Sequence, residues 1–154
     1  CRFVTTVNGP SIVWDTHKDN FNGLKNRLVP PMEQAFAALL DDLADRGLLD
    51  ETIVLWIGDF GRTPVINKDT GRDHWPRANF ALMAGGGMKT GQVIGSTDRN
   101  GMDVADRPVK FQEVFATLYS CLGIDTSTAT VMDTSGRPQY LVDSGITPIR
   151  ELVG

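Results

Sequence analysis

The sequence contains few of the residues that usually carry chemistry, with two histidines and two cysteines among 154 residues. Two cysteines permit at most one disulfide, and we expect Cys121, on an apolar helical face, to be a buried free thiol. The apolar runs at residues 52–57 and 80–84 are far shorter than the roughly 20 residues that cross a bilayer. Basic residues are scattered and the net charge is −4, which argues against a nucleic-acid surface. A membrane span, a disulfide scaffold and nucleic-acid binding are therefore not expected.

Length and composition predict a single domain over residues 1–154, because a chain of this size with 41% hydrophobic residues can bury a core. The chain begins with Cys1 and shows neither an initiator methionine nor a signal-peptide pattern. We therefore expect it to be a fragment of a longer domain.

Periodicity predicts two amphipathic helices. The first opens at Pro30 and Pro31 and closes at Gly47, and the second spans residues 110–122 and closes at Gly123. Apolar residues recur at helical spacing in both: Met32, Ala35, Phe36, Leu39, Leu40 and Leu43, then Phe111, Val114, Phe115, Leu118, Tyr119 and Leu122. A last helical turn is expected at residues 149–152.

Short runs rich in apolar and β-branched residues predict strands at residues 2–7, 12–14, 52–57 and 79–84, with an edge strand at 92–94. The continuous apolar run at 52–57 is typical of a strand that is covered on both faces. Because a helix separates consecutive strands, and such crossovers usually join parallel neighbours, the expected fold class is α/β: a mostly parallel sheet flanked by helices.

Both histidines stand close to an aspartate and a tryptophan, in Trp-Asp-Thr-His (residues 14–17) and Asp-His-Trp (residues 73–75). Parallel strands bind ligands at their carboxyl ends, where Asp15 and Asp59 are expected to emerge together with a long loop that carries His74. Carboxylate and imidazole ligands suit zinc, manganese or iron better than calcium. We therefore predict a metal site formed by Asp15, His17, Asp59 and His74. The alternative is that both histidines are structural and that Asp59 caps a turn.

Three further charged residues flank this predicted site and are assigned to substrate binding: Arg62, Arg72 and Asp73. A guanidinium pairs well with a tetrahedral oxyanion through two parallel hydrogen bonds. The alternative for both arginines is a structural ion pair with Asp59 or Asp73.

Four segments together resemble a known family. Trp-Asp-Thr-His (14–17), Gly-Asp-Phe-Gly-Arg-Thr-Pro (58–64), Gly-Arg-Asp-His-Trp-Pro (71–76) and Ala-Gly-Gly-Gly (84–87) look like the serial signatures of the domain of unknown function 1501 family. The resemblance implies a sulfatase-like fold of the alkaline phosphatase superfamily, whose members hydrolyse or transfer phosphate and sulfate esters at a two-metal site. It also implies a location outside the cytoplasm, because relatives often carry twin-arginine export signals.

The resemblance assigns roles to individual residues. Asp15 and His17 look like the first ligand loop, His74 resembles a later histidine ligand, and Asp59 with Phe60 occupies the place of an Asp–His pair. Phe60 cannot bind a metal, which weakens the second metal position. The superfamily's nucleophile comes from an N-terminal segment, so we expect no catalytic nucleophile in this chain and take the N-terminal remainder of the same domain as its partner.

Two functions follow from the residues and the resemblance together. The first is the C-terminal part of a hydrolase that uses a divalent metal, zinc or manganese, on small-molecule phosphate or sulfate esters, and that is inactive as an isolated fragment. The second is a non-catalytic scaffold or binding module with a degenerate metal site, which Phe60 favours.

Overall fold

The strands of the protein form short antiparallel pairs. The computed structural model describes residues 3–6 and 14–153. Within them, four two-stranded sheets are present: β1 (Ile53–Ile57) with β4 (Ala81–Gly85), β2 (Gly61–Ile66) with β3 (Arg72–Trp75), β5 (Ser96–Thr97) with β6 (Val104–Asp106), and β7 (Thr130–Met132) with β8 (Pro138–Tyr140).

The predicted parallel sheet flanked by helices is wrong for the described residues, and so is the alkaline phosphatase-like fold. β1 pairs antiparallel with β4, from Ile53 opposite Gly85 to Ile57 opposite Ala81. The chain between these two strands is the β2–β3 hairpin and not a crossover helix, so β4 returns along β1 in the opposite direction. An antiparallel ribbon covered on both faces produces the same unbroken apolar run as a parallel strand, which explains the error.

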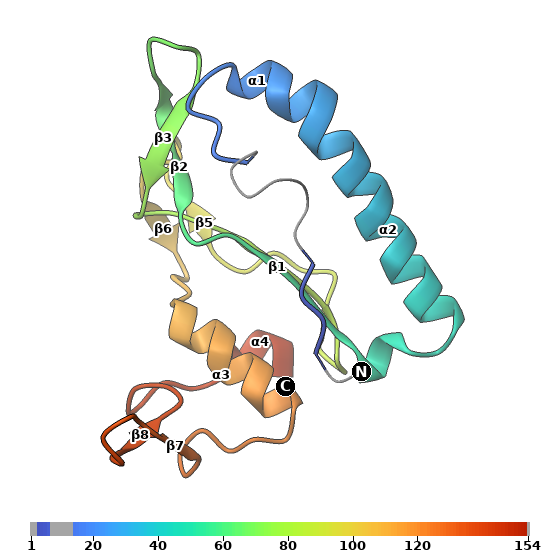
Figure 1. Cartoon of the computed structure of the whole chain (residues 1–154), viewed down its shortest axis with the longest axis vertical. Helices are drawn as coiled ribbons and strands as arrows, with labels where there is room; N and C mark the ends of the chain where they lie inside the picture. The colour runs from blue at the N-terminus through green and yellow to red at the C-terminus, as the bar shows by residue number, and fades with distance from the viewer. Residues whose placement is uncertain (1–2, 7–13, 154) are drawn as a thin grey trace.

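Helices cover the two faces of the β1–β4 ribbon, as Figure 1 shows. On one face, Trp56 of β1 lies 6.3 Å from Phe36 of α2 (Val29–Asp45), measured between ring centroids. On the other face, the apolar side chains of β1 pack against α3 (Phe111–Cys121) and α4 (Arg150–Val153). The core on that face consists of Met88, Val114, Ile149 and Leu152, with Ile53, Leu55, Ile57, Met83, Ile94 and Cys121 packed against it.

Both predicted amphipathic helices are confirmed. α2 ends at Asp45 and is followed by Gly47, whose φ of 67° is the left-handed conformation that glycine adopts readily at helix ends. The helical segment begins earlier than predicted, with α1 (Asn20–Gly23) and a π-helical turn, η1 (Leu24–Leu28). Prolines lack an amide donor, which the first turn of a helix tolerates, so the two prolines stand at the start of α2 but do not start the helical segment.

The remaining predictions of local structure have mixed outcomes. The last helical turn is confirmed as α4, and a short 3₁₀ turn, η2 (Leu49–Glu51), precedes β1. Residues 92–94 form no strand: they lie between Gly91 and Gly95, whose φ values of 77° and 81° break an extended run. Residues 3–6 and Trp14 are not in a strand either, and the other positions of the predicted strands at 2–7 and 12–14 lie outside the described residues. Cys121 is a free, half-buried thiol whose pKa is raised by burial.

The chain leaves an unusually large surface open to solvent. Its accessible area is 11113 Å², whereas a compact monomer of 16.8 kDa is expected to expose about 7,700 Å². Large apolar side chains contribute to the excess, among them Phe80 at 64% and Val93 at 94% exposure. No helix among the described residues has the length and apolar character needed to span a membrane.

Candidate metal centre

The loop that carries Asp15 and His17 lies against the β2–β3 hairpin. The amide of Asn20 donates to the carbonyl of Thr70 over 3.1 Å, and the amide of Arg72 donates to the carbonyl of Thr16 over 3.1 Å. These backbone bonds join residues that are 50 and 56 positions apart in sequence. They bring the two histidines of the chain to one place.

Gly71 makes this close approach possible. A Cβ atom at residue 71 would lie 1.9 Å from the carbonyl oxygen of His17 and 2.0 Å from its carbonyl carbon. Any other side chain would therefore push the His17 loop away from the hairpin. Gly71 is therefore required for the position of His17 in addition to its place in the local turn.

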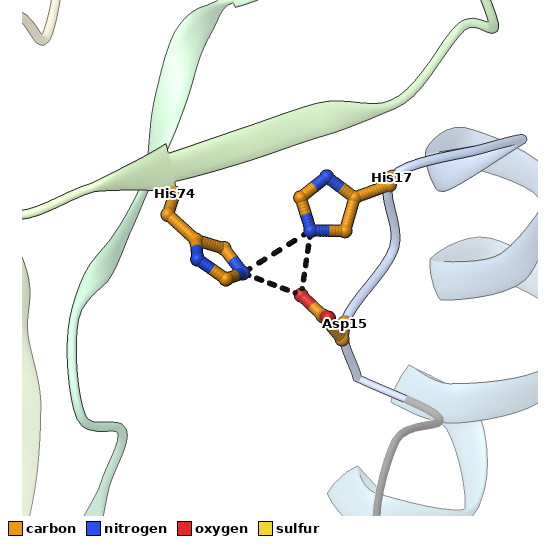
Figure 2. A group of neighbouring side chains, drawn as sticks. All are labelled: Asp15, His17 and His74. Carbon is orange, nitrogen blue, oxygen red and sulfur yellow. Dashed lines mark hydrogen bonds and ion pairs between the residues drawn. The ribbon is translucent and has the colours of Figure 1, made fainter.

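Asp15, His17 and His74 form a compact cluster, shown in Figure 2. Asp15 Oδ1 lies 3.1 Å from His17 Nε2 and 2.9 Å from His74 Nε2, and the two Nε2 atoms are 3.1 Å apart. Ligand atoms in a tetrahedral zinc site lie about 3.3 Å from one another, given zinc–nitrogen bonds of about 2.0–2.1 Å. The three atoms thus form one face of such a site after an outward shift of a few tenths of an ångström. The donor set fits a divalent transition metal.

Asp73 contacts the opposite side of the His17 ring. His17 Nδ1 lies 2.7 Å from Asp73 Oδ1, so the proton of a neutral His17 is best placed on Nδ1. That tautomer leaves the lone pair of Nε2 facing Asp15 and His74. Metal-binding histidines commonly make this contact with a carboxylate, which orients the ring and raises its basicity.

Both carboxylates of the cluster favour their charged form. The hydrogen bond with His74, followed by the hydrogen bond with Arg62, holds the pKa of Asp15 at about 2. The hydrogen bonds with His17 and Asn67 lower the pKa of Asp73. At neutral pH the two carboxylates outweigh the single positive charge of Arg62 beside Asp15, which suits a cation.

The two arginines assigned to substrate binding have different surroundings. Arg62 Nη2 lies 2.5 Å from Asp15 Oδ1, so its guanidinium borders the cluster. Arg72 Nη1 donates to the carbonyls of Thr63 and Pro64, over 2.8 and 3.0 Å, and so ties together the two strands of the hairpin. The geometry gives Arg72 a structural contact and leaves Arg62 as the arginine at the site.

Asp59 and Phe60 lie between β1 and β2. Asp59 accepts a hydrogen bond from the amide of Phe60 over 3.0 Å, and the three-residue cluster does not include it. Phe60 packs on His74, with 4.2 Å between ring centroids and 44° between ring planes. The structure therefore places the aromatic ring of Phe60, which offers no ligand atom, beside His74.

Sequence reasoning missed Asn67, which directly follows β2. Its side-chain amide donates to the carbonyl of His17 over 3.0 Å and to Asp73 Oδ1 over 3.1 Å. The available signal was its position four residues before Gly71, in a turn rich in polar residues, because asparagine side chains commonly bond to the backbone a few positions on.

One carboxylate and two imidazoles, gathered at the surface by a loop and a hairpin, define a protein with a candidate metal centre. The chain belongs to the DUF1501 family, described as a protein of unknown function, whose sequence profile matches residues 1–153. No curated protein and no solved structure matches the chain.

Proposed function

We propose that Asp15, His17 and His74 bind one divalent transition metal, zinc or manganese, and that the metal serves the hydrolysis of phosphate or sulfate esters, as in sulfatase-like enzymes. The observation that carries the proposal is the convergence of three ligand atoms within 3.1 Å of one another, with Asp73 on the far nitrogen of His17. Coordinating imidazoles are neutral and coordinating carboxylates are ionised. Asp15, whose pKa is lowered to about 2, is ionised at neutral pH as coordination requires.

The number of ligands favours catalysis over a purely structural metal. Three protein ligands leave a coordination position for water or for a substrate oxygen, whereas structural zinc sites are closed by four. A metal in such a position supplies either an activated water or polarisation of a phosphoryl or sulfuryl oxygen. The side chains of Asp15, His17 and His74 are 39%, 39% and 48% exposed, so a small ester can reach them.

Arg62 is the residue that we propose for binding the ester oxyanion. Its guanidinium shares Asp15 Oδ1 with the two histidines, and its side chain is 26% exposed. Guanidinium groups pair with tetrahedral oxyanions through two parallel hydrogen bonds, and Arg62 has further N–H groups besides the one that faces Asp15. A cation in the cluster would also compete with Arg62 for Asp15, which frees the guanidinium for substrate.

The proposal requires a further part of the protein. We identify no activated nucleophile in the site, and we propose that it comes from an N-terminal remainder of the same domain. The large accessible surface supports this idea, because it exceeds that of a compact monomer by about 3,400 Å² and includes exposed apolar side chains that a further segment would cover.

Phe60 favours a second function, in which the chain is a binding module with a degenerate metal site. Its ring lies against His74 and provides no ligand atom. Assays of the full-length protein on phosphate and sulfate esters, with and without added zinc or manganese, separate the two functions. Metal-dependent turnover supports the hydrolase, and metal binding without turnover on any ester supports the binding module.

The metal site itself is tested by His17→Ala and His74→Ala in the full-length protein. Each change removes one of three ligands, so we expect affinity to fall by more than the roughly 10–100-fold that is typical when a residue that only orients a ligand is lost. Asp42→Ala is the matched control, since Asp42 is an exposed carboxylate paired with Arg46 on α2. Metal content is measured by elemental analysis and affinity by calorimetry. Unchanged metal content in both histidine variants would disprove the site.

A further inference from the structure

We propose that Asn67 is a positioning residue that holds Asp73 and the backbone of His17, and thereby fixes the tautomer of His17 that binds metal. This inference rests on the proposed metal site for its functional meaning. Its structural basis lies in the hydrogen bonds of one side chain.

The side chain of Asn67 uses its full hydrogen-bonding capacity. Its Oδ1 accepts from the amides of Asp69 and Gly71, over 3.0 and 2.9 Å. Its Nδ2 donates to the carbonyl of His17 and to Asp73 Oδ1, over 3.0 and 3.1 Å. An amide group has two acceptor lone pairs and two N–H donors, and all four are satisfied here. Because both acceptor contacts are backbone amides, the orientation of the side chain is unambiguous.

The two donor bonds control His17 from both ends. One bond fixes the backbone carbonyl of His17, which determines where its side chain begins. The other bond contacts the same Asp73 oxygen that lies 2.7 Å from His17 Nδ1, and so keeps that oxygen directed at the ring. With Nδ1 held in this contact, Nε2 faces Asp15 and His74 with its lone pair. Removing the amide leaves Asp73, on an exposed strand, free to rotate away.

Replacing Asn67 by aspartate separates this role from that of the turn. Asn67→Asp has nearly the same shape and keeps an acceptor for the amides of Asp69 and Gly71. It places a carboxylate oxygen where the amide nitrogen stood, about 3 Å from Asp73 Oδ1 and from the His17 carbonyl. Both donor bonds are replaced by repulsion while the turn is retained.

The first test is the tautomer of His17 in the metal-free full-length protein, read from nitrogen chemical shifts by NMR. We expect the Nδ1–H tautomer in the wild type and a shift toward Nε2–H in Asn67→Asp. Asn79→Asp is the control, because the side-chain amide of Asn79 donates to the carbonyl of Gly58 and the charge change is identical. An unchanged His17 tautomer in a folded Asn67→Asp protein would overturn the inference. Since no metal is needed, this result is independent of the proposed function.

The second test is a double-mutant cycle of metal affinity with Asp73→Ala. In the wild-type background, Asn67→Asp is expected to weaken metal binding by about 10-fold or more, as for other residues that orient a ligand. In the Asp73→Ala background, the effect is expected to be clearly smaller, because no carboxylate remains at residue 73 for the new carboxylate to repel and only the contact with the His17 carbonyl is lost. Equal losses in both backgrounds would show that Asn67 does not act through Asp73.

Folding of the variants is also informative. If Asn67→Asp fails to fold while the double variant folds, the coupling between residues 67 and 73 is established by the rescue. If both fail to fold while Asp73→Ala alone folds, Asn67 serves the turn only and the inference is wrong.

Discussion

Replacing Gly71 by alanine tests whether the site depends on the contact between the His17 loop and the hairpin. The added Cβ would lie 1.9 Å from the carbonyl oxygen of His17, whereas separations under 3.0 Å are essentially never observed. The loop must therefore retreat by about 1 Å or more. Metal sites tolerate deviations of only about 0.2 Å in ligand distance, so this retreat removes His17 from the cluster.

The cost in stability follows from two of the hydrogen bonds that join the His17 loop to the hairpin near residue 71. These are the bond from the amide of Arg72 to the carbonyl of Thr16 and the bond from Asn67 to the carbonyl of His17. Each such bond contributes about 0.5–1.5 kcal/mol, so Gly71→Ala should lower the free energy of unfolding by about 1–3 kcal/mol. Metal affinity should fall to the level of His17→Ala, because the same ligand is lost.

The assay combines urea denaturation with calorimetric titration of zinc into the full-length protein. Gly58→Ala is the matched control: Gly58 also lies in a loop near the site, and a Cβ there would meet only the Phe60 carbonyl, at an ordinary 3.7 Å. That variant should keep wild-type stability and metal affinity. The reasoning is refuted if Gly71→Ala binds zinc as tightly as the wild type and unfolds at the same urea concentration.

Two further predictions concern parts of the fold outside the candidate site. Glu151 pairs with Arg107 through Nε at 2.7 Å and Nη2 at 2.9 Å, and this hydrogen bonding lowers the pKa of Glu151 from 4.5 to about 2. Glu151→Gln should therefore lower the free energy of unfolding at neutral pH. The difference from wild type should shrink as the pH falls from about 4.5 through about 2, and denaturation curves recorded at stepped pH values measure it. A difference that persists at the lowest pH would contradict this. Trp56→Ala removes a ring that lies 5.8 Å from Phe80 and 6.3 Å from Phe36, and should cost about 2 kcal/mol in urea denaturation, less than the roughly 3–5 kcal/mol of a fully buried ring.

Periodicity was sufficient to locate α2, α3 and the strands β1 and β4, but not to determine how the strands pair. The amphipathic spacing in residues 110–122 indicates a helix with one buried face. Only one packing arrangement fits this pattern, so α3 lies where it was predicted. The run at residues 52–57 reports two buried faces, which both a parallel sheet and a covered antiparallel ribbon provide. The direction of β4 depends on how residues 58–80 return, and a hairpin within that segment has no distinctive apolar pattern of its own.

The convergence of Asp15, His17 and His74 was predicted through the edge of a parallel sheet, which the described residues do not form. What brings these residues together is the contact of a loop with a hairpin, which depends on Gly71 and on backbone hydrogen bonds. Such contacts leave little trace in a single sequence, because backbone groups are the same at every residue. For the same reason the sequence did not reveal that Asp73 lies on His17 or that Asn67 holds both.

The distance between the two imidazoles limits the protons that they can carry on Nε2. A structural His17 between two carboxylates would carry both protons, with Nδ1 donating to Asp73 and Nε2 donating to Asp15. The Nε2 atom of His74 lies 2.9 Å from the same Asp15 oxygen and 3.1 Å from His17 Nε2. Two Nε2–H groups at that separation would direct their protons into the same small space and repel, so at least one of the two nitrogens must present a lone pair. Asp73 already binds the Nδ1 side of His17, so the lone pair belongs most naturally on His17 Nε2, which is the state that a metal requires.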